Sequence, residues 1–421
     1  MTKVYIKTFG CALNQSDSEL MAGLLKQARF EIVDNPEDAF VIIINTCTVK
    51  GPSESKFFTY LEKLKKEYKY KKIIITGCIP QTEPKKLQGY PLLGTSQLTN
   101  IVQLVEETMH ENPVEMLSKE KLPRLNLPKI RKNPVIEIIP ICEGCLGEPC
   151  AYCKVKAARG ELRSYPKEEI IQQARDAIQH RIPELWLTAQ DTGCYGKDIN
   201  SSLPELLGEL IKIPGNFKIR LGMLNPNHLL EFLDKLIEIY KSEKMFKFLH
   251  IPVQSGNDHI LKSMKRKYTA EQFKEITNRF RREIPEITIA TDIICGFPGE
   301  TEEQFNDSVK LIRYLMPDVL NVSKFWPRPK TKAAKMKHQV PGEERKKRST
   351  LIAYIAENVG KLRNERWLDW EGEILIDEIG KDNTFVGRNF AYKPVIVAGN
   401  YQLGDKIKVK IKKITPYDLR A

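Results

Sequence analysis

The chain has 421 residues, of which 41% are hydrophobic and 29% are charged, and its formal net charge is +13. This balance is that of a globular protein and excludes a largely disordered chain. At about 150 residues per domain, the length predicts roughly three domains. The excess of Lys and Arg suits a polyanionic partner such as nucleic acid, while a lysine-rich surface that serves solubility explains the charge equally well.

The sequence carries no recognisable targeting or membrane-spanning segment. Its first residues, MTKVYIKTFG, have the pattern of a strand rather than of a signal peptide. No apolar run approaches the roughly 18 residues that a membrane span needs. Nine cysteines in such a chain favour metal, cluster or redox chemistry over disulfides. We therefore expect a soluble, cytoplasmic protein.

The first block, residues 1–122, alternates strands and helices. The apolar runs VYIKTFG, VIIIN and IIITG predict strands, and residues 16–29 and 53–68 have helical patterns. Strands that alternate with helices are typical of a doubly wound parallel sheet. A stretch rich in Pro and Lys, residues 122–134, then indicates a linker.

The second block, residues 132–362, repeats strand and helix about six times. Helical patterns cover residues 167–180, 227–240, 270–282 and 302–315. The predicted strands are residues 135–141, 185–189, 218–222, 246–251, 287–293 and 319–325. A complete barrel of this kind has eight strand–helix units, so the pattern predicts a partial (βα)6 barrel in an α/β protein.

The last block, residues 366–421, has short alternating strands such as GEILIDEIG, YKPVIVAG and DKIKVKIKKI, separated by turns rich in Gly and Asn. About 55 residues of this type predict a small β-barrel of OB-like size.

Three early cysteines each follow a predicted strand. Cys11 follows VYIKTFG, Cys47 follows VIIINT and Cys78 follows IIITG. Because ligands of parallel sheets bind at the carboxyl edge, we expect the three thiols to converge there. Such a triad can hold an iron–sulfur cluster. Taken singly, each cysteine is equally typical of a small buried hydrophobic residue. Gly10 and Gly77 would allow close backbone approach.

A second cysteine group follows the first strand of the predicted barrel. Cys142, Cys145, Cys150 and Cys153 lie where barrel enzymes place their active sites. Two Cys-x2-Cys pairs suggest zinc, but only four residues separate the pairs, far fewer than the roughly 15–20 of zinc ribbons. The other interpretation is a 4Fe-4S cluster on Cys145, Cys150 and Cys153.

These stretches together resemble a known family. The barrel and its cysteine loop resemble radical S-adenosylmethionine (SAM) enzymes, and the whole chain resembles a methylthiotransferase. The most similar subgroup is the archaeal and eukaryotic enzyme that acts on threonylcarbamoyladenosine in tRNA. The matching stretches are TFGCALNQSDSE, INTCTVKGPSE, ITGCIPQ, AARGELRSYP, ELWLTAQDTGCYGKD, HIPVQSGND, TDIICGFPGET and WPRPKTKAAKM.

The resemblance implies two 4Fe-4S clusters and SAM. The cluster on Cys145, Cys150 and Cys153 would bind SAM and cleave it to a radical. The cluster on Cys11, Cys47 and Cys78, called the auxiliary cluster below, would carry the sulfur that becomes the methylthio group. Radical chemistry from a cofactor suits an aromatic C–H bond, because general acids and bases cannot activate such a bond. The last domain would be the RNA-binding TRAM module.

One departure from the family pattern concerns the cysteine loop. The family spacing is Cys-x3-Cys-x2-Cys, whereas this chain has Cys-x4-Cys-x2-Cys, with one residue inserted near Glu148 and Pro149. Loops tolerate insertions. Cys142 is then either a bystander, which we favour, or a substitute ligand. Cys194 and Cys295 are expected to be structural.

Other residues at the predicted barrel mouth are candidates for cofactor binding. Tyr152 matches an aromatic position that lies beside SAM in the family, although loop packing would also explain it. Gln190 and Asp191 follow the second strand, where capping of the next helix is equally plausible. Gln254 and Asp292 end later strands. His250, Arg159 and Arg163 are weaker candidates, with structural hydrogen bonding or ion pairing as the default.

The positive charge is concentrated in one part of the chain. Residues 321–366 contain 13 Lys or Arg and four Asp or Glu, and a further run, KIKVKIKK, lies near the C-terminus. Phosphate contacts explain such a patch, and a solvated charged helix is the alternative for ERKKR. We predict RNA contacts at Arg328, Lys330, Lys393 and Lys406.

The implied partners are tRNA and an electron donor such as a ferredoxin or a flavodoxin-like protein, with no membrane. Two other functions stay open at this point. One is a methylthiotransferase for isopentenyladenosine or for an aspartate of a ribosomal protein. The other is a non-catalytic protein that binds zinc and RNA.

Overall fold

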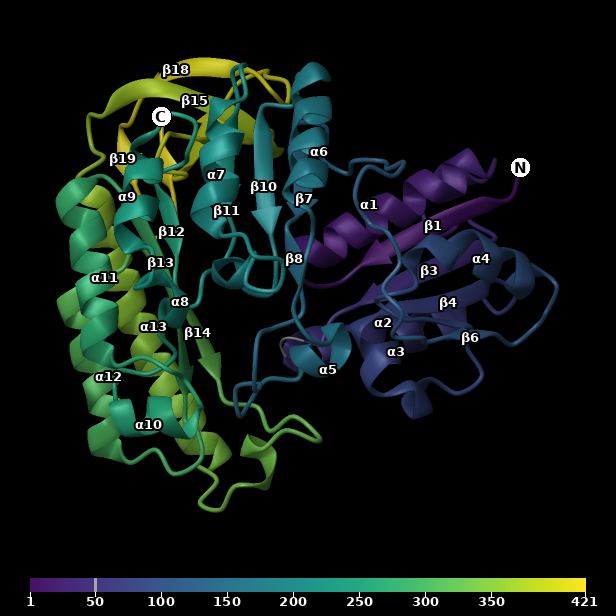
Figure 1. Cartoon of the computed structure of the whole chain (residues 1–421), viewed down its shortest axis with the longest axis horizontal. Helices are drawn as coiled ribbons and strands as arrows, with labels where there is room; N and C mark the ends of the chain where they lie inside the picture. Colours follow the sequence, from purple (N-terminus) through teal and green to yellow (C-terminus); the bar gives the residue numbers. More distant parts are fainter. Residues whose placement is uncertain (49–50) are drawn as a thin grey trace.

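The computed structural model describes residues 1–48 and 51–421, except for the side chain of Pro52. A parallel sheet formed by the N-terminal residues lies beside a larger set of parallel strands and helices, and a C-terminal sheet covers one end of that set (Figure 1). The predicted α/β architecture is confirmed.

The N-terminal sheet has six parallel strands in the order β2-β1-β3-β4-β5-β6. The strands are β1 (Lys3–Thr8), β2 (Glu31–Val33), β3 (Val41–Thr46), β4 (Lys72–Gly77), β5 (Leu92–Leu93) and β6 (Glu115–Met116). The helices are α1 (Ala12–Gln27), α2 (Gly51–Glu67), α3 (Cys78–Thr82), η1 (Pro84–Leu87), η2 (Leu98–Asn100) and α4 (Ile101–Met109).

Runs of isoleucine in β3 and β4 cover both faces of this sheet. Side chains alternate between the faces of a strand. Ile43 therefore packs with α1 and α4 on one face, and Ile42 and Ile44 pack with α2 on the other. Burial on both faces explains why these strands are continuously apolar. The predicted doubly wound sheet is confirmed.

Six parallel strands form the partial barrel. They are β7 (Ile136–Pro140), β10 (Glu184–Thr188), β11 (Lys218–Leu221), β12 (Phe248–His250), β13 (Thr288–Cys295) and β14 (Val319–Lys324). They form two ladders, β11-β10-β7 and β12-β13-β14. A parallel bridge between Ile219 and Met245 lies between the ladders. All six strands occur where the sequence predicts them.

The largest apolar core lies between these strands and the helices around them. The helices are α6 (Lys167–Gln179), η3 (Thr192–Cys194), α7 (Leu203–Lys212), α8 (Pro226–Leu229), α9 (Leu233–Lys241), α10 (Asp258–Ser263), α11 (Ala270–Glu283) and α12 (Glu302–Leu315). Capping boxes begin α11 at Thr269 and α12 at Thr301. The single helix predicted over residues 227–240 is instead two, interrupted at Phe232, whose φ of −140° is not helical.

Several short elements surround the cysteine loop. They are the hairpin strands β8 (Cys142–Glu143) and β9 (Arg163–Ser164), the helix α5 (Val155–Arg159) and the turn η4 (Ala333–Lys335). Their few residues carry no detectable periodicity, and the sequence does not predict them.

A 24-residue helix, α13 (Gly342–Glu365), leads to the C-terminal sheet. Its strands are β15 (Glu371–Ile379), β16 (Thr384–Arg388), β17 (Pro394–Ala398), β18 (Lys406–Lys410), β19 (Lys413–Ile414) and β20 (Leu419–Arg420). They form a curled mixed sheet in the order β18-β15-β16-β17-β20-β19, in agreement with the predicted small β-domain.

The C-terminal sheet packs at the amino-terminal ends of the barrel strands (Figure 1). The amide N–H of Lys247, just before β12, donates to the carbonyl oxygen of Phe390. Tyr392 stacks against Phe246 and Phe248. The cysteine loops lie at the opposite, carboxyl-terminal end, so the two predicted functional regions are at different ends of the barrel.

Candidate functional site

The first three cysteines lie where the sequence places them, at the carboxyl edge of the N-terminal sheet. Cys11 is the N-cap of α1, Cys47 follows β3 directly, and Cys78 begins α3 after β4. Gly10 has a φ of +117°, and a Cβ added there would lie 2.8 Å from the Cys47 Sγ. The first two cysteine loops are therefore in contact, and the close approach requires glycine.

Two buried asparagines hold these loops together. Asn14 Nδ2 donates to the carbonyl oxygens of Thr46 (2.8 Å) and Phe9 (3.0 Å). Asn45 Nδ2 donates to the carbonyl oxygen of Asn14 (2.8 Å). The Cys11 thiol lies 3.8 Å from Asn14 Oδ1. Hydrogen bonds between buried groups fix the loops that carry the thiols.

The second cysteine loop follows β8. Its residues 146–149 are exposed, whereas Cys145, Cys150 and Cys153 are partly buried. The inserted residue near Glu148 and Pro149 therefore lies in the exposed part of the loop. The backbone of Ala151 anchors the loop, because it donates to the carbonyl of Met264 and accepts from the amide of Ala333.

The thiols of this loop interact with one another and with specific donors. Arg266 Nη1 donates to Cys150 Sγ (3.4 Å), and the Val155 N–H donates to Cys153 Sγ (3.4 Å). Burial raises the pKa of Cys153 to about 11 and raises that of Cys145 well above its usual value. Metal binding requires the deprotonated thiolate, so loading of this site must release protons.

Cys142 is fully buried and forms its thiol hydrogen bond outside this group of thiols. Its thiol donates to the carbonyl of Asp191 (3.6 Å), as does that of Cys194 (3.0 Å). Contact with Cys194, together with burial, raises the pKa of Cys142 well above its usual value. This environment supports the interpretation of Cys142 and Cys194 as structural. Cys295 is also fully buried, and burial raises its pKa to about 12.

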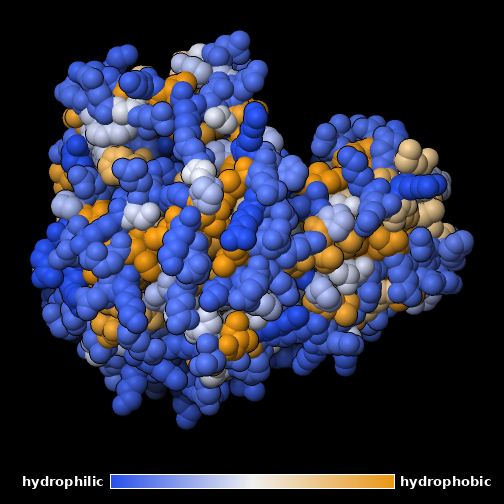
Figure 2. Space-filling view, turned by 45° about the horizontal axis from the view of Figure 1, so that its top comes forward, coloured by the Kyte–Doolittle hydropathy of each residue, from blue (hydrophilic) through white to orange (hydrophobic). Residues whose placement is uncertain are grey.

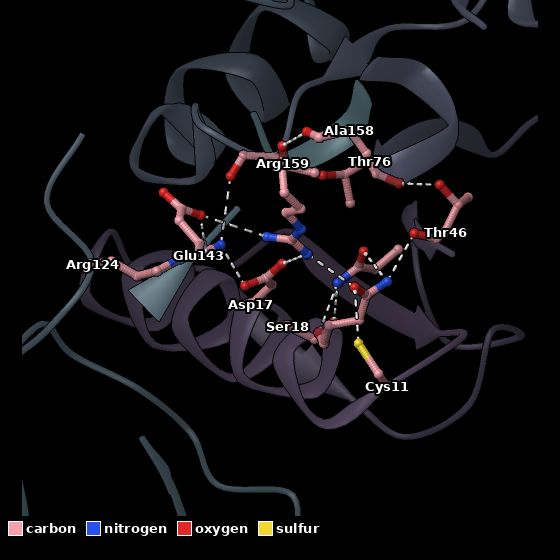
Figure 3. Close-up of polar contacts among 12 residues, drawn as sticks. Cys11, Asp17, Ser18, Thr46, Thr76, Arg124, Glu143, Ala158 and Arg159 are labelled. Carbon is pink, nitrogen blue, oxygen red and sulfur yellow. Dashed lines mark hydrogen bonds and ion pairs between the residues drawn. The ribbon is translucent and has the colours of Figure 1, made fainter. Parts of the chain in front are cut away.

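A buried network of charges joins the two cysteine-bearing parts of the chain (Figure 3). Asp17 on α1 pairs with Arg124 (2.5 Å) and with Arg159 at the end of α5 (2.7 Å). Glu143 pairs with Arg124 at 2.9 Å. Arg159 Nη2 also donates to Asn14 Oδ1 at 2.9 Å. Arg159, a weak cofactor or RNA candidate from sequence, thus lies between the two cysteine sets.

Gln190 and Asp191 lie at the carboxyl end of β10, as predicted. Gln190 Oε1 accepts the amide N–H of Gly144 in the cysteine loop (2.7 Å). Asp191 Oδ1 accepts the amide N–H groups of Gly193 and Asn225, both at 3.0 Å. Asp191 therefore caps η3, which is the structural alternative that the sequence left open.

The other candidates at the mouth lie on β12, β13 and the cysteine loop. His250 Nε2 lies 2.7 Å from Asp292 Oδ2, and both side chains are 22% exposed. Gln254 has a φ of +71° and bonds through its backbone to Asp292 and Ile294. Tyr152 packs edge-on against Phe297. Their roles in cofactor binding stay predictions.

Two of the predicted RNA contacts are corrected by the structure. Arg328 is 5% exposed, and its guanidinium donates to Thr48 and pairs with Glu54 (3.1 Å). Lys393 is 3% exposed and pairs with Asp318 (3.6 Å), and burial lowers its pKa to about 8. Both cations bind groups inside the protein and are not available to RNA phosphates.

The other two predicted RNA contacts are exposed. Lys330 has a φ of +67° and forms no ion pair within the described part of the chain. Lys406 pairs with Glu373 (3.7 Å) and bonds to Asn216 (2.8 Å). Along β18, Lys410 pairs with Glu371 at 3.0 Å. The lysines of KIKVKIKK are thus partly neutralised by carboxylates of β15.

The structure also divides the basic stretch that the sequence treats as one patch. Residues 326–341 lie at the end of the barrel that carries the cysteine loops, since Arg328 binds Thr48 and Ala333 binds Ala151. The C-terminal sheet lies at the other end. At 1.5 Å per residue, α13 spans about 36 Å between them.

Arg266 is the most important residue that the sequence reasoning missed. It donates to Cys150 and also to Asn225 Oδ1 (2.8 Å) and Tyr268 Oη (2.9 Å). It lies between Lys265 and Lys267, so no local signal distinguishes it from a surface residue. Asp17 and Arg124 were also missed, because their ion-pair partners are distant in the sequence.

Both cysteine sets fit iron–sulfur clusters by their chemistry. Each consists of three thiols, which are the usual ligands of such clusters. Cys11 and Cys78 interact electrostatically, as do Cys145, Cys150 and Cys153. Across residues 1–48 and 51–421, no three His, Cys, Asp or Glu side chains converge as a single metal ion requires. A sulfide-bridged cluster does not require the three thiolates to converge on one point, because each thiolate binds a different iron atom.

The visible surface is mainly hydrophilic. Figure 2 shows polar residues over most of one face, with hydrophobic residues between them. Among the helices that the structure describes, none is both long enough and apolar enough to cross a bilayer.

Three families match successive parts of the sequence. These are the uncharacterized protein family UPF0004 over residues 3–92, the radical SAM superfamily over residues 138–312 and the TRAM domain over residues 371–421. A solved radical SAM methyltransferase from Kitasatospora setae has a similar fold, with a TM-score of 0.55 and 14% identity. The similarity covers 77% of this chain and 73% of that one.

Relatives with higher identity cover nearly the whole chain. A probable threonylcarbamoyladenosine tRNA methylthiotransferase of Pyrococcus horikoshii is 44% identical over 402 residues, which is 94% of each chain. The human threonylcarbamoyladenosine tRNA methylthiotransferase is 41% identical over 97% of this chain and 72% of its own length. The predicted family is therefore confirmed. The chain belongs to the threonylcarbamoyladenosine tRNA methylthiotransferases of the radical SAM superfamily.

Proposed function

We propose that this chain converts N6-threonylcarbamoyladenosine beside the anticodon of tRNA into its 2-methylthio derivative. The observation that carries this proposal is the similarity to relatives of that name over 94% or more of the chain. The two cysteine sets, which lie on either side of α5, support it, because the reaction requires a radical source and a sulfur carrier.

We assign one 4Fe-4S cluster to Cys145, Cys150 and Cys153, and an auxiliary one to Cys11, Cys47 and Cys78. When bound, the clusters and SAM supply the radical, the sulfur and the methyl group. The chain's own residues hold this machinery in place. Arg266 and the Val155 N–H donate to thiols of the first set, and Gln190 holds the loop through Gly144.

An elongated RNA substrate suits the separation of the two functional regions. The TRAM sheet lies at one end of the barrel and the cysteine loops lie at the other, and α13, about 36 Å long, runs between these two ends. A substrate that contacts both must be long, as tRNA is. Lys330, exposed on the loop at the cluster end, is our candidate for a phosphate contact near the reacting nucleotide.

The reaction also requires an electron donor and access to tRNA. We propose a one-electron donor such as a ferredoxin or a flavodoxin-like protein, and a cytoplasmic location, where tRNA is modified. SAM is expected to lie against the barrel mouth, near Tyr152, Gln190, Asp191, Gln254 and Asp292.

The test is anaerobic reconstitution of the full chain with iron and sulfide, followed by an assay on tRNA that carries threonylcarbamoyladenosine. Nucleoside mass spectrometry should detect the 2-methylthio product. Iron analysis should give about eight atoms per chain, as two 4Fe-4S clusters require. Parallel reactions on tRNA with isopentenyladenosine and on ribosomal protein test the related substrates.

The possible outcomes separate the alternatives. Product only with isopentenyladenosine or only on ribosomal protein would change the assigned substrate. Bound zinc without labile sulfide would contradict the proposed enzyme activity and would favour a protein that binds zinc and RNA. About four irons per chain with full activity would contradict only the assignment of an auxiliary cluster and would leave the proposed reaction in place.

A further inference from the structure

Arg159 extends from the radical SAM part of the chain into the N-terminal cysteine site. It is the last residue of α5, which begins two residues after Cys153. Gly160 follows with a φ of +78°, a conformation that favours glycine and ends the helix there. The Arg159 side chain is 1% exposed. Its guanidinium is therefore held in the interface between the two cysteine sets.

One edge of the guanidinium is held by strong partners. Nη2 donates to Asp17 Oδ2 at 2.7 Å and to Asn14 Oδ1 at 2.9 Å. Asn14 itself contacts the Cys11 thiol and bonds to the carbonyl of Thr46, the residue before Cys47. Figure 3 shows the guanidinium between Asp17 and the side chains near Cys11. One asparagine thus links Arg159 to two of the three cysteine loops.

The Nη1 atom of the guanidinium lacks a hydrogen-bond acceptor among the described residues. Nη1 is buried and has no hydrogen-bond partner within the described residues, with Glu143 Oε2 at 4.0 Å. A buried cation without its full set of acceptors is costly. The Cys78 thiol lies beside the guanidinium: burial raises the pKa of Cys78, and the charge of Arg159 opposes this effect. The helix that Cys78 begins, α3, packs against α5, so the third cysteine of the set also lies beside the Arg159 guanidinium.

The charges around Arg159 balance before any cluster is present. Arg124 and Arg159 face Asp17 and Glu143, two cations against two anions. Because the network has no net charge, its burial costs less than that of an unpaired ion. Charge balance does not explain why the Nη1 donor of Arg159 lacks a hydrogen-bond acceptor among the described residues. An anionic sulfur ligand of the N-terminal cysteine site would supply the missing acceptor.

We propose that Arg159 is a positioning residue for the auxiliary cluster, with its buried guanidinium donating a hydrogen bond to the sulfur atoms of that site. The radical SAM part of the chain thereby holds the auxiliary cluster and raises its reduction potential, because a nearby positive charge favours the reduced, more negative state. The inference rests on the cluster assignment under the proposed function.

The experiment uses the full chain with Cys145, Cys150 and Cys153 all replaced by Ala, so that only the auxiliary cluster is loaded. The protein is labelled with 15N-arginine and reduced by dithionite, which donates one electron per cluster and is oxidised to sulfite. Pulsed EPR should detect a 15N coupling to the reduced cluster, and Arg159→Lys should abolish it. Absence of the coupling in the parent protein overturns the inference.

A redox titration followed by EPR adds a second measurement. Arg159→Gln should lower the midpoint potential, and Arg159→Lys, which keeps the charge, should lower it less. Arg348→Gln is the matched control, because Arg348 is also buried and pairs with Glu300 (2.9 Å) beside Cys295, which belongs to neither cysteine set. An unchanged potential in Arg159→Gln, or an equal shift in Arg348→Gln, overturns the inference. Failure of the parent protein to bind any cluster overturns the auxiliary-cluster assignment as well.

Discussion

Arg159 and Asp17 form an ion pair of 2.7 Å between residues that are 142 positions apart in the sequence. Asp17 lies on the first helix of the N-terminal sheet, and Arg159 lies on the helix that follows the radical SAM cysteines. Both side chains are at most 1% exposed. This pair connects the two parts of the chain that carry the cysteine sets.

Replacement of Asp17 by Asn should destabilise the protein strongly. It leaves Arg124 and Arg159 buried without their shared carboxylate, and the loss of one partner of a buried pair typically costs about 3–5 kcal/mol. Urea denaturation of the unloaded protein measures the change. Asp234→Asn is the control, because Asp234 is exposed and pairs with Arg279 at the surface, and it should change stability little. Equal effects of both substitutions would contradict a dominant role for the buried pair.

Replacement of Gly10 by Ala should disturb the auxiliary site. The added Cβ would lie 2.5 Å from the Cβ of Cys47, and the φ of +117° is unfavourable for alanine. We expect iron to fall from about eight to about four atoms per reconstituted chain. Gly89→Ala is matched in backbone strain, with a φ of +85° and no atom within 4 Å of the added Cβ. Full iron loading of the Gly10 variant would argue against a cluster on Cys47.

Replacement of Cys150 by Ala should abolish SAM cleavage, because a ligand of the radical SAM cluster is lost. Formation of 5′-deoxyadenosine from SAM is the measurement, and it should fall to the background of cluster-free protein. Cys142→Ala is the control and should retain cleavage, because its thiol contacts Asp191 and Cys194. Cleavage that survives in the Cys150 variant and disappears in the Cys142 variant would make Cys142 the ligand.

Replacement of Lys330 by Ala should weaken tRNA binding without loss of stability. Lys330 is exposed at the cluster end, and removal of one phosphate contact should lower the slope of log affinity against log salt by about 1. Fluorescence anisotropy at several salt concentrations gives both quantities. Lys212→Ala, on the exposed face of α7 and paired with Glu209, should leave the slope unchanged. An unaltered slope for Lys330→Ala removes this residue from the RNA interface.

The contact between the barrel and the C-terminal sheet should weaken as the pH rises. Burial, followed by the charge of Asp377, raises the pKa of Glu184 from 4.5 to about 8. Between these values the folded state binds the extra proton, so the contribution of Glu184 to the free energy of unfolding falls as pH increases and stops changing above about pH 8.

Glu184→Gln should remove this pH dependence, because the neutral amide cannot ionise and can still accept the hydrogen bond from Trp186 Nε1. Thermal unfolding from pH 5 to pH 9 measures the effect, and the variant should be more stable than the natural chain at the alkaline end. Glu209→Gln is the control on the exposed surface. A pH profile that is identical in the natural chain and the Glu184 variant would contradict the argument.

The sequence by itself determined the elements that depend on local patterns. Runs of isoleucine predict the buried strands β3 and β4, and the position of three cysteines after strands β1, β3 and β4 predicts that they share one sheet edge. Strand periodicity and the position of a residue after a strand are properties of a few neighbouring residues, so they are readable without tertiary information.

Only the tertiary structure decided which charges are available to a ligand. Arg328 and Lys393 have basic sequence surroundings but are buried against Glu54 and Asp318. Arg159 and Arg266 are no different in sequence from surface cations, yet both are placed beside cysteine thiols. Burial and ion pairing depend on residues that are far apart in the chain, and composition cannot reveal which partners the packing brings together.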